Sequence, residues 1–534
     1  MPRKLILPLL CLLLLIAPSV KAAVYFVDAG KANNTGNGLS WANAKKDLQA
    51  ALNAAAAGDE IWVKAGTYLP TSEPDGNNGT GDPRNKSIYL ATKDLKVYGG
   101  FAGTEILLSQ RNAITNITVL SGDLDGPGGS ADAYPVLVTF ERTTACIVDG
   151  FTIRGGRANG NGVPVIYYVN GISGTAPSYY NNHGGGISNY KSNPTISNCI
   201  ITSNTATNYG GGIENSASSP AIANCTISSN SASTGGGMCI QGAGPGDNLT
   251  VSGCTLSSNT GGGLYNNGSS LTVSNTTFSN NTGRGITNQS SNLTVTGSTF
   301  SGNNAGSGND GGGLFFYNTT TVRYLTLSNN TFSSNSGYRS GAVSIQRTIV
   351  ASITGCNFSG NTAGAYGGAV HIDCTDQFST PSNSFNNCTF SGNSGGRGGG
   401  IYNFAAILSI TGSSFSSNTA SEKGGGIYSE YGNDAYSITN STFSGNIAGT
   451  DGGGLYNVHS TPVISSCTFT GNNAAGSAGG IYTTFYGANF KNCIISGNTS
   501  NNASLQDLYF DGGSITYSLI GRQITQVPMA TEQA

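Results

Sequence analysis

One tetrapeptide, an apolar residue followed by two small or polar residues and an asparagine, recurs along most of the chain. It ends twelve times at an asparagine, and these asparagines lie 22 to 32 residues apart, about 27 on average. A repeat of this length indicates a solenoid, because one unit buries its apolar side chains only by stacking on the next. The ladder asparagines are Asn204, Asn230, Asn259, Asn281, Asn303, Asn335, Asn361, Asn393, Asn418, Asn446, Asn472 and Asn498.

Each repeat contains three short strand-like pieces separated by Gly, Asn and Ser, and it shows no helical periodicity. In the piece "SSCTFTGN", alternation places Cys467 and Phe469 on one face and Thr468 on the other. Three strands and three turns in about 27 residues predict one coil of an all-β parallel β-helix. Twelve regular coils at about 4.8 Å each predict a rod on the order of 60 Å long.

Stacking also accounts for the residue types that recur. We expect each ladder asparagine to adopt a left-handed turn and to pass its amide hydrogen bond to the next coil. Eight phenylalanines are predicted to form an internal column: Phe278, Phe300, Phe332, Phe358, Phe390, Phe415, Phe443 and Phe469.

Seven cysteines stand five residues before a ladder asparagine, and we interpret them as buried thiols that act as small apolar fillers. Disulfides between adjacent coils remain an alternative in an exported protein. The sequence contains no C-x-x-C pair, which disfavours zinc. The seven are Cys199, Cys225, Cys254, Cys356, Cys388, Cys467 and Cys493.

The ends of the chain differ from the repeats. Residues 1–22 are predicted to be a signal peptide, with a basic start, the apolar run Leu5–Ile16 and a small-residue cleavage site. Residues 23–84 are expected to form a cap of strand, helix and strand, in which the helix plugs the open end of the solenoid. The β-helix is predicted over 85–500, with a loop insertion at about 157–183, and 501–534 form a last coil and a polar tail.

Charge and composition narrow the function. Only 9% of residues are charged, and loss of Arg3, Lys4 and Lys21 with the signal peptide leaves 21 basic and 26 acidic residues, a net charge of −5. This balance gives no electrostatic reason to bind nucleic acid. No later stretch reaches the roughly 20 apolar residues of a membrane-spanning helix. We therefore expect a secreted or cell-surface protein without a transmembrane segment in the mature chain.

The segments "SWANAKKDLQAALNAAAAGDEIWVKAGTY", "VYGGFAGTE", "TVLSGDLDG" and "DGFTIRGG" resemble exported bacterial proteins of the pectin-lyase-like superfamily, of the choice-of-anchor Q type. The resemblance covers roughly 24–520 and implies a right-handed parallel β-helix. The Gly-Gly-Ala-Val at Gly367–Val370 and the F-x-x-N tetrapeptides also look like the repeats of polymorphic outer membrane proteins, which are adhesins.

Enzymes of that superfamily use paired carboxylates, or clustered aspartates with calcium, on acidic polysaccharides. The N-T-D, D-D and R-I-K signatures of the hydrolases are absent from this sequence, and acidic residues are sparse in the repeats. The strongest candidates for acid–base catalysis are His371, Asp373 and Asp376. Surface polar groups at the edge of a coil are the interpretation that we favour for them. We expect no cofactor and no metal.

Aromatic residues suggest binding instead. A tyrosine follows Gly-Gly-x-[IL] at Tyr402, Tyr428, Tyr456 and Tyr482 in consecutive coils, and also at Tyr265. If the Ile or Leu points inward, alternation places these rings outside, where a row of them could meet a polysaccharide or a molecule on a neighbouring cell. A row that merely shields the sheet is the alternative. The sequence thus favours a non-catalytic protein of adhesion or carbohydrate contact, with a polysaccharide lyase or glycoside hydrolase and a structural spacer as alternatives.

Overall fold

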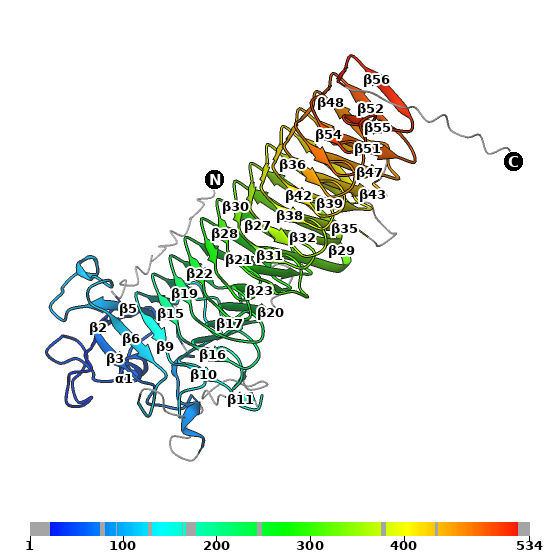
Figure 1. Ribbon diagram of the computed structural model, residues 1–534. Helices are drawn as coiled ribbons and strands as arrows, with labels where there is room; N and C mark the ends of the chain where they lie inside the picture. Colours follow the sequence, from blue (N-terminus) through cyan, green and yellow to red (C-terminus); the bar gives the residue numbers. More distant parts are fainter. Residues whose placement is uncertain are drawn as a thin grey trace, which may run out of the picture.

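The computed structural model describes residues 22–74, 81–91, 93–126, 131–162, 164–166, 178–242, 248–374, 381–432 and 436–521. Over these residues the chain forms a parallel β-solenoid of about 12 turns, with very little helix. Figure 1 shows the coils stacked into a rod between the N-terminal and C-terminal ends. The predicted all-β solenoid is confirmed. The predicted signal peptide and the polar tail after residue 521 lie outside the described residues.

One coil in the regular part shows how the sequence pattern produces the fold. It consists of the strands β43 (Ile427–Glu430), β44 (Ser437–Thr439), β45 (Thr442–Ser444) and β46 (Ile447–Ala448). Along β45 only Phe443 is buried in the core, while its neighbours are exposed or half-buried. Each strand pairs in parallel, without a shift of register, with the equivalent strand of the next coil.

These pairings extend through the rod as three large sheets. We call them sheet A, sheet B and sheet C, with thirty, sixteen and seven strands. Sheet A receives the first two strands of each coil, and two long strands, β29 (Leu314–Ser328) and β32 (Val343–Thr354), run through both positions. Sheet B runs from β3 (Gly66–Tyr68) to β57 (Leu519–Ile520), and sheet C from β31 (Ser336–Gly337) to β54 (Thr499–Ser500).

The N-terminal segment is part of the solenoid. The strands β1 (Val24–Val27) and β2 (Glu60–Lys64) pair in parallel, and β2 pairs with β5 (Lys96–Phe101), so both belong to sheet A. The helix α1 (Leu48–Ala54) buries Leu48 and Leu52 in the same apolar core that runs through the coils. In the predicted insertion, β11 (Pro164–Ile166) pairs antiparallel with β12 (Ser178–Tyr180).

The ladder asparagines are buried along the whole rod, each at most 2% exposed. Asn418 is typical: its backbone N–H and its Nδ2 both donate to Oδ1 of Asn446, at 3.1 and 2.9 Å, and Nδ2 also donates to the carbonyl of Phe390 at 3.0 Å. One amide therefore joins three successive coils. The ladder ends at Asn498, which donates to Oδ1 of Asp507 in the same way.

The residue with left-handed backbone conformation lies one position earlier in each repeat than predicted. In all twelve repeats the residue directly before the ladder asparagine has positive φ, as at Ser417 (φ 55°) and Gly445 (φ 63°). The ladder asparagine itself does not have positive φ, and its amide reaches both neighbouring coils. The left-handed residue supplies the bend that aims it.

The predicted phenylalanine column is confirmed. All eight rings are fully buried, and successive ring centroids lie 4.3 to 5.1 Å apart with planes within 8° of parallel. The seven cysteines before ladder asparagines are buried free thiols, as interpreted from the sequence. Burial raises the pKa of the Cys388 thiol to about 12, so this side chain is neutral.

The ladder generates a paired test of stability. Asn472 and Asn473 are adjacent, but Asn472 is buried in the ladder and Asn473 is exposed. We expect Asn472→Ala to lower the free energy of unfolding by about 2–5 kcal/mol, because it leaves buried donors and acceptors of two coils without partners. We expect Asn473→Ala to change it by less than about 0.5 kcal/mol.

The measurement is chemical denaturation of both variants, with hydrogen exchange to locate the opening. Faster exchange should be concentrated in the coils on either side of residue 472, because coils contact only their neighbours. Equal effects of the two substitutions would contradict a stabilising role of the buried amides.

Candidate functional site

The first strand of each coil in sheet A presents one outer position that forms a column along the rod. Register places Tyr402 of β39 (Ile401–Phe404) beside Tyr428 of β43, and then Tyr456 of β47 (Leu455–Val458). Tyr482 of β51 (Ile481–Thr484) and Tyr509 of β55 (Leu508–Phe510) follow. The predicted row of consecutive tyrosines therefore exists, and it lies outside the main core as a separate cluster.

The predicted exposure of this row was wrong. Tyr402, Tyr428 and Tyr456 are only 6, 5 and 7% exposed, and Tyr482 is half-buried. The rings stack on one another, with centroids 5.2, 5.2 and 5.0 Å apart from Tyr402 to Tyr482 and planes within 8° of parallel. Since each face contacts the next ring, no face between neighbours remains to stack on a sugar.

The edges of the row are also engaged. Lys423 comes from the connection before β43; its Nζ lies 4.4 Å from the centroid of the Tyr456 ring and donates to Tyr456 Oη at 2.9 Å. Tyr428 Oη donates to Glu430 at 2.9 Å. Burial, and then this hydrogen bond, raises the pKa of Tyr428 far above its ordinary value, so the phenol is neutral. These contacts favour a shielding role for the row, and its binding role stays a prediction.

His371 and Asp373 lie on the same outer face of β35 (Val370–Asp373), as predicted. His371 belongs to the column and is only 1% exposed. Its ring centroid lies 5.5 Å from that of Tyr366 and 5.4 Å from that of Tyr402. Burial, and secondarily Arg339, lowers the pKa of His371 to about 3. An enclosed imidazole with this pKa is a poor acid–base catalyst near neutral pH, and its burial contradicts a surface position.

The charged partner of Asp373 among the described residues is an arginine and not His371. Its Oδ2 lies 3.9 Å from Nη1 of Arg339, and its Oδ1 is buried without a hydrogen-bond partner. Asp310 is on the other side of the same guanidinium, with Oδ2 3.9 Å from Nε of Arg339. Asp376, the third predicted catalytic residue, lies outside the described residues.

A cleft opens on the same outer face of sheet A where two coils are shorter than the rest. The next strand of sheet A begins five positions after the ladder asparagine from Asn259 to Leu264 and from Asn281 to Ile286, but nine positions after it from Asn418 to Ile427. The shortened connections precede β23 (Leu264–Asn267) and β26 (Ile286–Gln289). They expose the outer surface of these strands between longer connections on either side.

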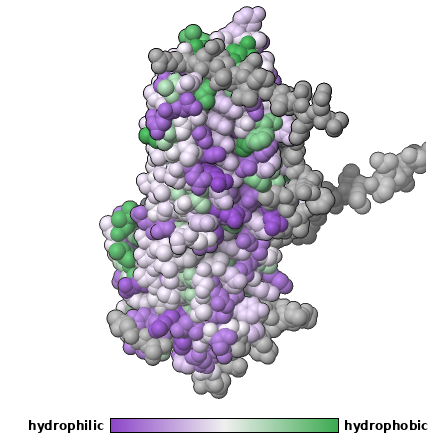
Figure 2. All heavy atoms as spheres, turned by 45° about the vertical axis from the view of Figure 1, so that its right-hand side comes forward, coloured by the Kyte–Doolittle hydropathy of each residue, from purple (hydrophilic) through white to green (hydrophobic). Residues whose placement is uncertain are grey.

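The cleft has a volume of about 560 Å³. Tyr265, Thr287 and Gln289 line it from the strands, and Tyr265 Oη donates to Gln289 Oε1 at 3.0 Å. Within the described part of the chain, Tyr265 stacks on no other ring: its neighbours in the column are Cys239 and Thr287. Tyr265 is half-buried, and among the described residues no aromatic ring covers either of its faces. Figure 2 shows a largely hydrophilic or intermediate surface on the side it displays, with small separate hydrophobic areas.

The walls of the cleft are polar and mostly uncharged. Its other lining residues include hydroxyl and amide side chains, and Arg284 is the only charged residue among those that line it. No Asp or Glu is among these lining residues. Sequence reasoning missed the cleft, although the two 22-residue coils that create it are visible in the spacing of Asn259, Asn281 and Asn303.

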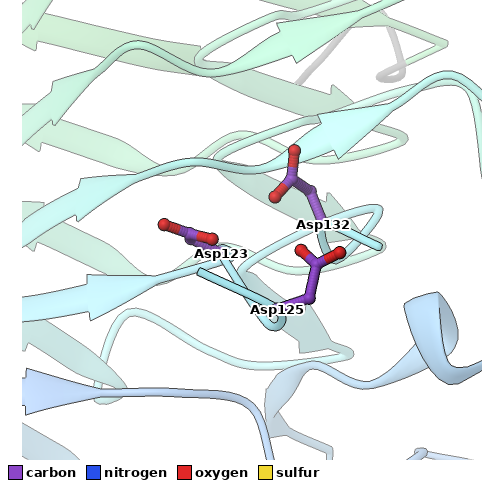
Figure 3. Close-up of side chains that lie close together, drawn as sticks. All are labelled: Asp123, Asp125 and Asp132. Atoms are coloured by element: carbon purple, nitrogen blue, oxygen red, sulfur yellow. The ribbon is translucent and has the colours of Figure 1, made fainter. Parts of the chain in front are cut away.

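Among the described residues, one group of three aspartates has carboxylates close enough together to bind a metal ion. Asp123, Asp125 and Asp132 follow β6 (Thr118–Ser121), and their carboxylates lie within 4.8 Å of one another (Figure 3). Burial, and then the charge of Asp123, raises the pKa of Asp132. Calcium prefers six to eight oxygen ligands, so three carboxylates alone make an incomplete shell. The sequence prediction of no metal did not consider this group.

Comparisons with known proteins agree on the fold. The sequence family "Right handed beta helix region" matches residues 106–266 and 214–344, and the "Chlamydia polymorphic membrane protein repeat" matches 412–430 and 440–458. No curated protein matches the chain.

Among solved structures, the surface protein and adhesin PfbA of Streptococcus pneumoniae is 11% identical, covers 89% of this chain and 95% of its own, and has a TM-score of 0.33. Pectate lyase Pel9A is 13% identical, with 73% and 78% covered and a TM-score of 0.30. The receptor-binding domain of the siphovirus 9NA tailspike is 11% identical, with 91% and 76% covered and a TM-score of 0.25. At these values the likeness carries no conclusion about the function of this chain.

The buried histidine generates a prediction of pH dependence. Because the pKa of His371 is about 3 in the folded chain and near 6.5 when unfolded, the unfolded state binds one proton more between these values. His371 therefore makes stability fall as pH decreases through this window, by about 1.4 kcal/mol per pH unit. His371→Tyr, which continues the column, should remove this contribution.

The measurement is chemical denaturation of both proteins from pH 7.5 to 4.5, with NMR titration of the three histidines. The resonance of His371 should not titrate above pH 4. A midpoint near 6.5 for this residue would contradict its enclosure between Tyr366 and Tyr402.

Proposed function

Because this chain is a right-handed β-helix repeat protein, we propose that it is an exported or cell-surface protein that binds a carbohydrate chain without cleaving it. The observation that carries the proposal is the cleft over the two short coils. There Tyr265 borders open space and has no aromatic ring against it among the described residues, and the cleft is large enough for a small oligosaccharide.

The chemistry of the cleft fits sugars. Sugar rings combine an apolar face, which stacks on aromatic rings, with hydroxyl groups that donate and accept hydrogen bonds. Tyr265 supplies the ring, and Gln289, Asn304 and Asn309 supply amides that can do both. A polysaccharide or a glycan on a neighbouring cell surface is therefore the partner we propose.

The lining also bears on catalysis. Hydrolysis of a glycosidic bond uses two carboxyl groups on either side of the scissile bond. The lining residues of the cleft include no carboxylate. The nearby carboxylates of Asp310 and Asp373 each lie 3.9 Å from Arg339 and share its single positive charge. These features support binding over a lyase or hydrolase, and the presence of the cleft supports binding over a purely structural spacer.

The proposal is tested by filling the cleft. Replacing residues 260–263 with a copy of residues 419–426 gives the short connection the length found elsewhere in the rod. We expect this graft to abolish binding in a glycan array, and Tyr265→Ala to weaken binding to the same glycan about ten-fold. Isothermal titration measures the affinity.

Two controls match these variants. The same graft in place of residues 447–454 keeps that connection at eight residues and should leave binding unchanged. Tyr482→Ala removes a ring from the same column outside the cleft and should also leave binding unchanged. Unaltered binding after the cleft is filled, or the release of any product from a bound glycan, would overturn the proposed function.

A further inference from the structure

Arg284 occupies an unusual position in the wall of the cleft. It comes from the second short connection, two residues before β26, and its guanidinium carbon lies 4.3 Å from the centroid of the Phe315 ring. Its Nε donates to the backbone carbonyl of Asp310 at 2.6 Å, and its Nη2 to the side-chain oxygen of Asn309 at 3.4 Å. A guanidinium has five N–H donors, so these two bonds leave three without an acceptor among the described residues.

The guanidinium also has no carboxylate in contact with it among the described residues. Other arginines differ: Arg397 contacts Glu422 at 2.6 Å, and Arg339 has carboxylates at 3.9 Å on both sides. Burial lowers the pKa of Arg284, and the charge of Asp310 only partly offsets this effect. A partly desolvated cation without a counter-ion is costly, and a bound anion removes that cost.

We propose that Arg284 is an anion subsite of the cleft, so that the glycan it accepts carries a carboxylate, sulfate or phosphate group. The inference rests on the proposed function and adds the chemical class of the ligand. Two adjacent N–H donors of a guanidinium match the two oxygens of such a group. Phe315 and Asp310 fix the plane of the guanidinium, so its remaining donors are pre-oriented.

The position of the subsite relative to Tyr265 supports one ligand across both. Leu264, next to Tyr265, pairs with Ile286, two residues after Arg284. Arg284 therefore lies about one coil, roughly 4.8 Å, farther along the rod than Tyr265. A sugar stacked on Tyr265 places its own substituent, or that of the adjoining unit, at Arg284.

The experiment uses pairs of probes that share one sugar backbone, one member with an anionic group and the other without it. These are trigalacturonate with its methyl ester, a sulfated disaccharide with its unsulfated form, and a sugar phosphate oligomer with its dephosphorylated form. Affinities are measured by isothermal titration for the full chain. We expect at least one anionic probe to bind ten-fold or more tightly than its neutral partner, and the preferred pair identifies the anion.

Two substitutions separate charge from folding. Arg284→Gln should reduce that preference to less than about two-fold, whereas Arg284→Lys should keep part of it. Arg397→Gln, at an arginine with its own carboxylate partner, should keep all of it. Thermal unfolding of each variant confirms that the rod is intact.

The outcomes distinguish the two proposals. Equal binding of charged and neutral probes, abolished when the cleft is filled, would overturn the role of Arg284 and leave the proposed function standing. A preference for anions that persists in Arg284→Gln would also overturn the role of Arg284. The absence of binding by every probe and every array glycan would overturn both.

Discussion

The register between successive coils rests on the amide of one buried asparagine per coil. Each ladder amide donates to the coil before it and to the coil after it, so a shift of one coil by a single residue would break bonds on both sides. Because the register is fixed there, every other side chain meets the same position of its neighbours. The phenylalanine column inside and the tyrosine column outside both follow from it. A loss of hydrogen bonding at one rung therefore affects packing on two faces of the rod.

The connection between the ladder asparagine and the next strand of sheet A lies outside this constraint. Its length varies while the strands stay aligned, and its residues lie over the outer column. Where it is long, side chains such as Lys423 cover the stacked tyrosines. Where it is short, before Leu264 and Ile286, the column is open and Tyr265 borders a cleft. The same outer position is thus a structural support in one part of the rod and a candidate binding surface in another.

The buried positions inside the rod could be predicted from the sequence because the same pattern of apolar and polar residues recurs in many coils. Phe443 alternates with polar neighbours, and seven other coils repeat the pattern at the same distance from an asparagine. Alternation also placed Tyr428 on the outer face, which is correct. Alternation could not show that Lys423, from the connection before the strand of Tyr428, contacts the ring of Tyr456. It also could not show that adjacent rings stack face to face. The lysine contact depends on the path of the connection, which alternation does not describe. For the same reason His371 looked like a surface residue. Asp123 and Asp132 lie close together in a segment outside the regular repeats, so the repeat pattern could not predict their proximity.

Along the rod, the distance from Tyr265 to the equivalent outer position of another coil is a whole number of coil spacings, since every coil adds the same step. The cleft therefore lies at a fixed number of coils from each end of the rod. Duplication or loss of a complete coil between Tyr265 and one end of the rod would change the distance of the cleft from that end without altering its lining. The height of the cleft above the end of the rod can therefore change independently of the residues that line it.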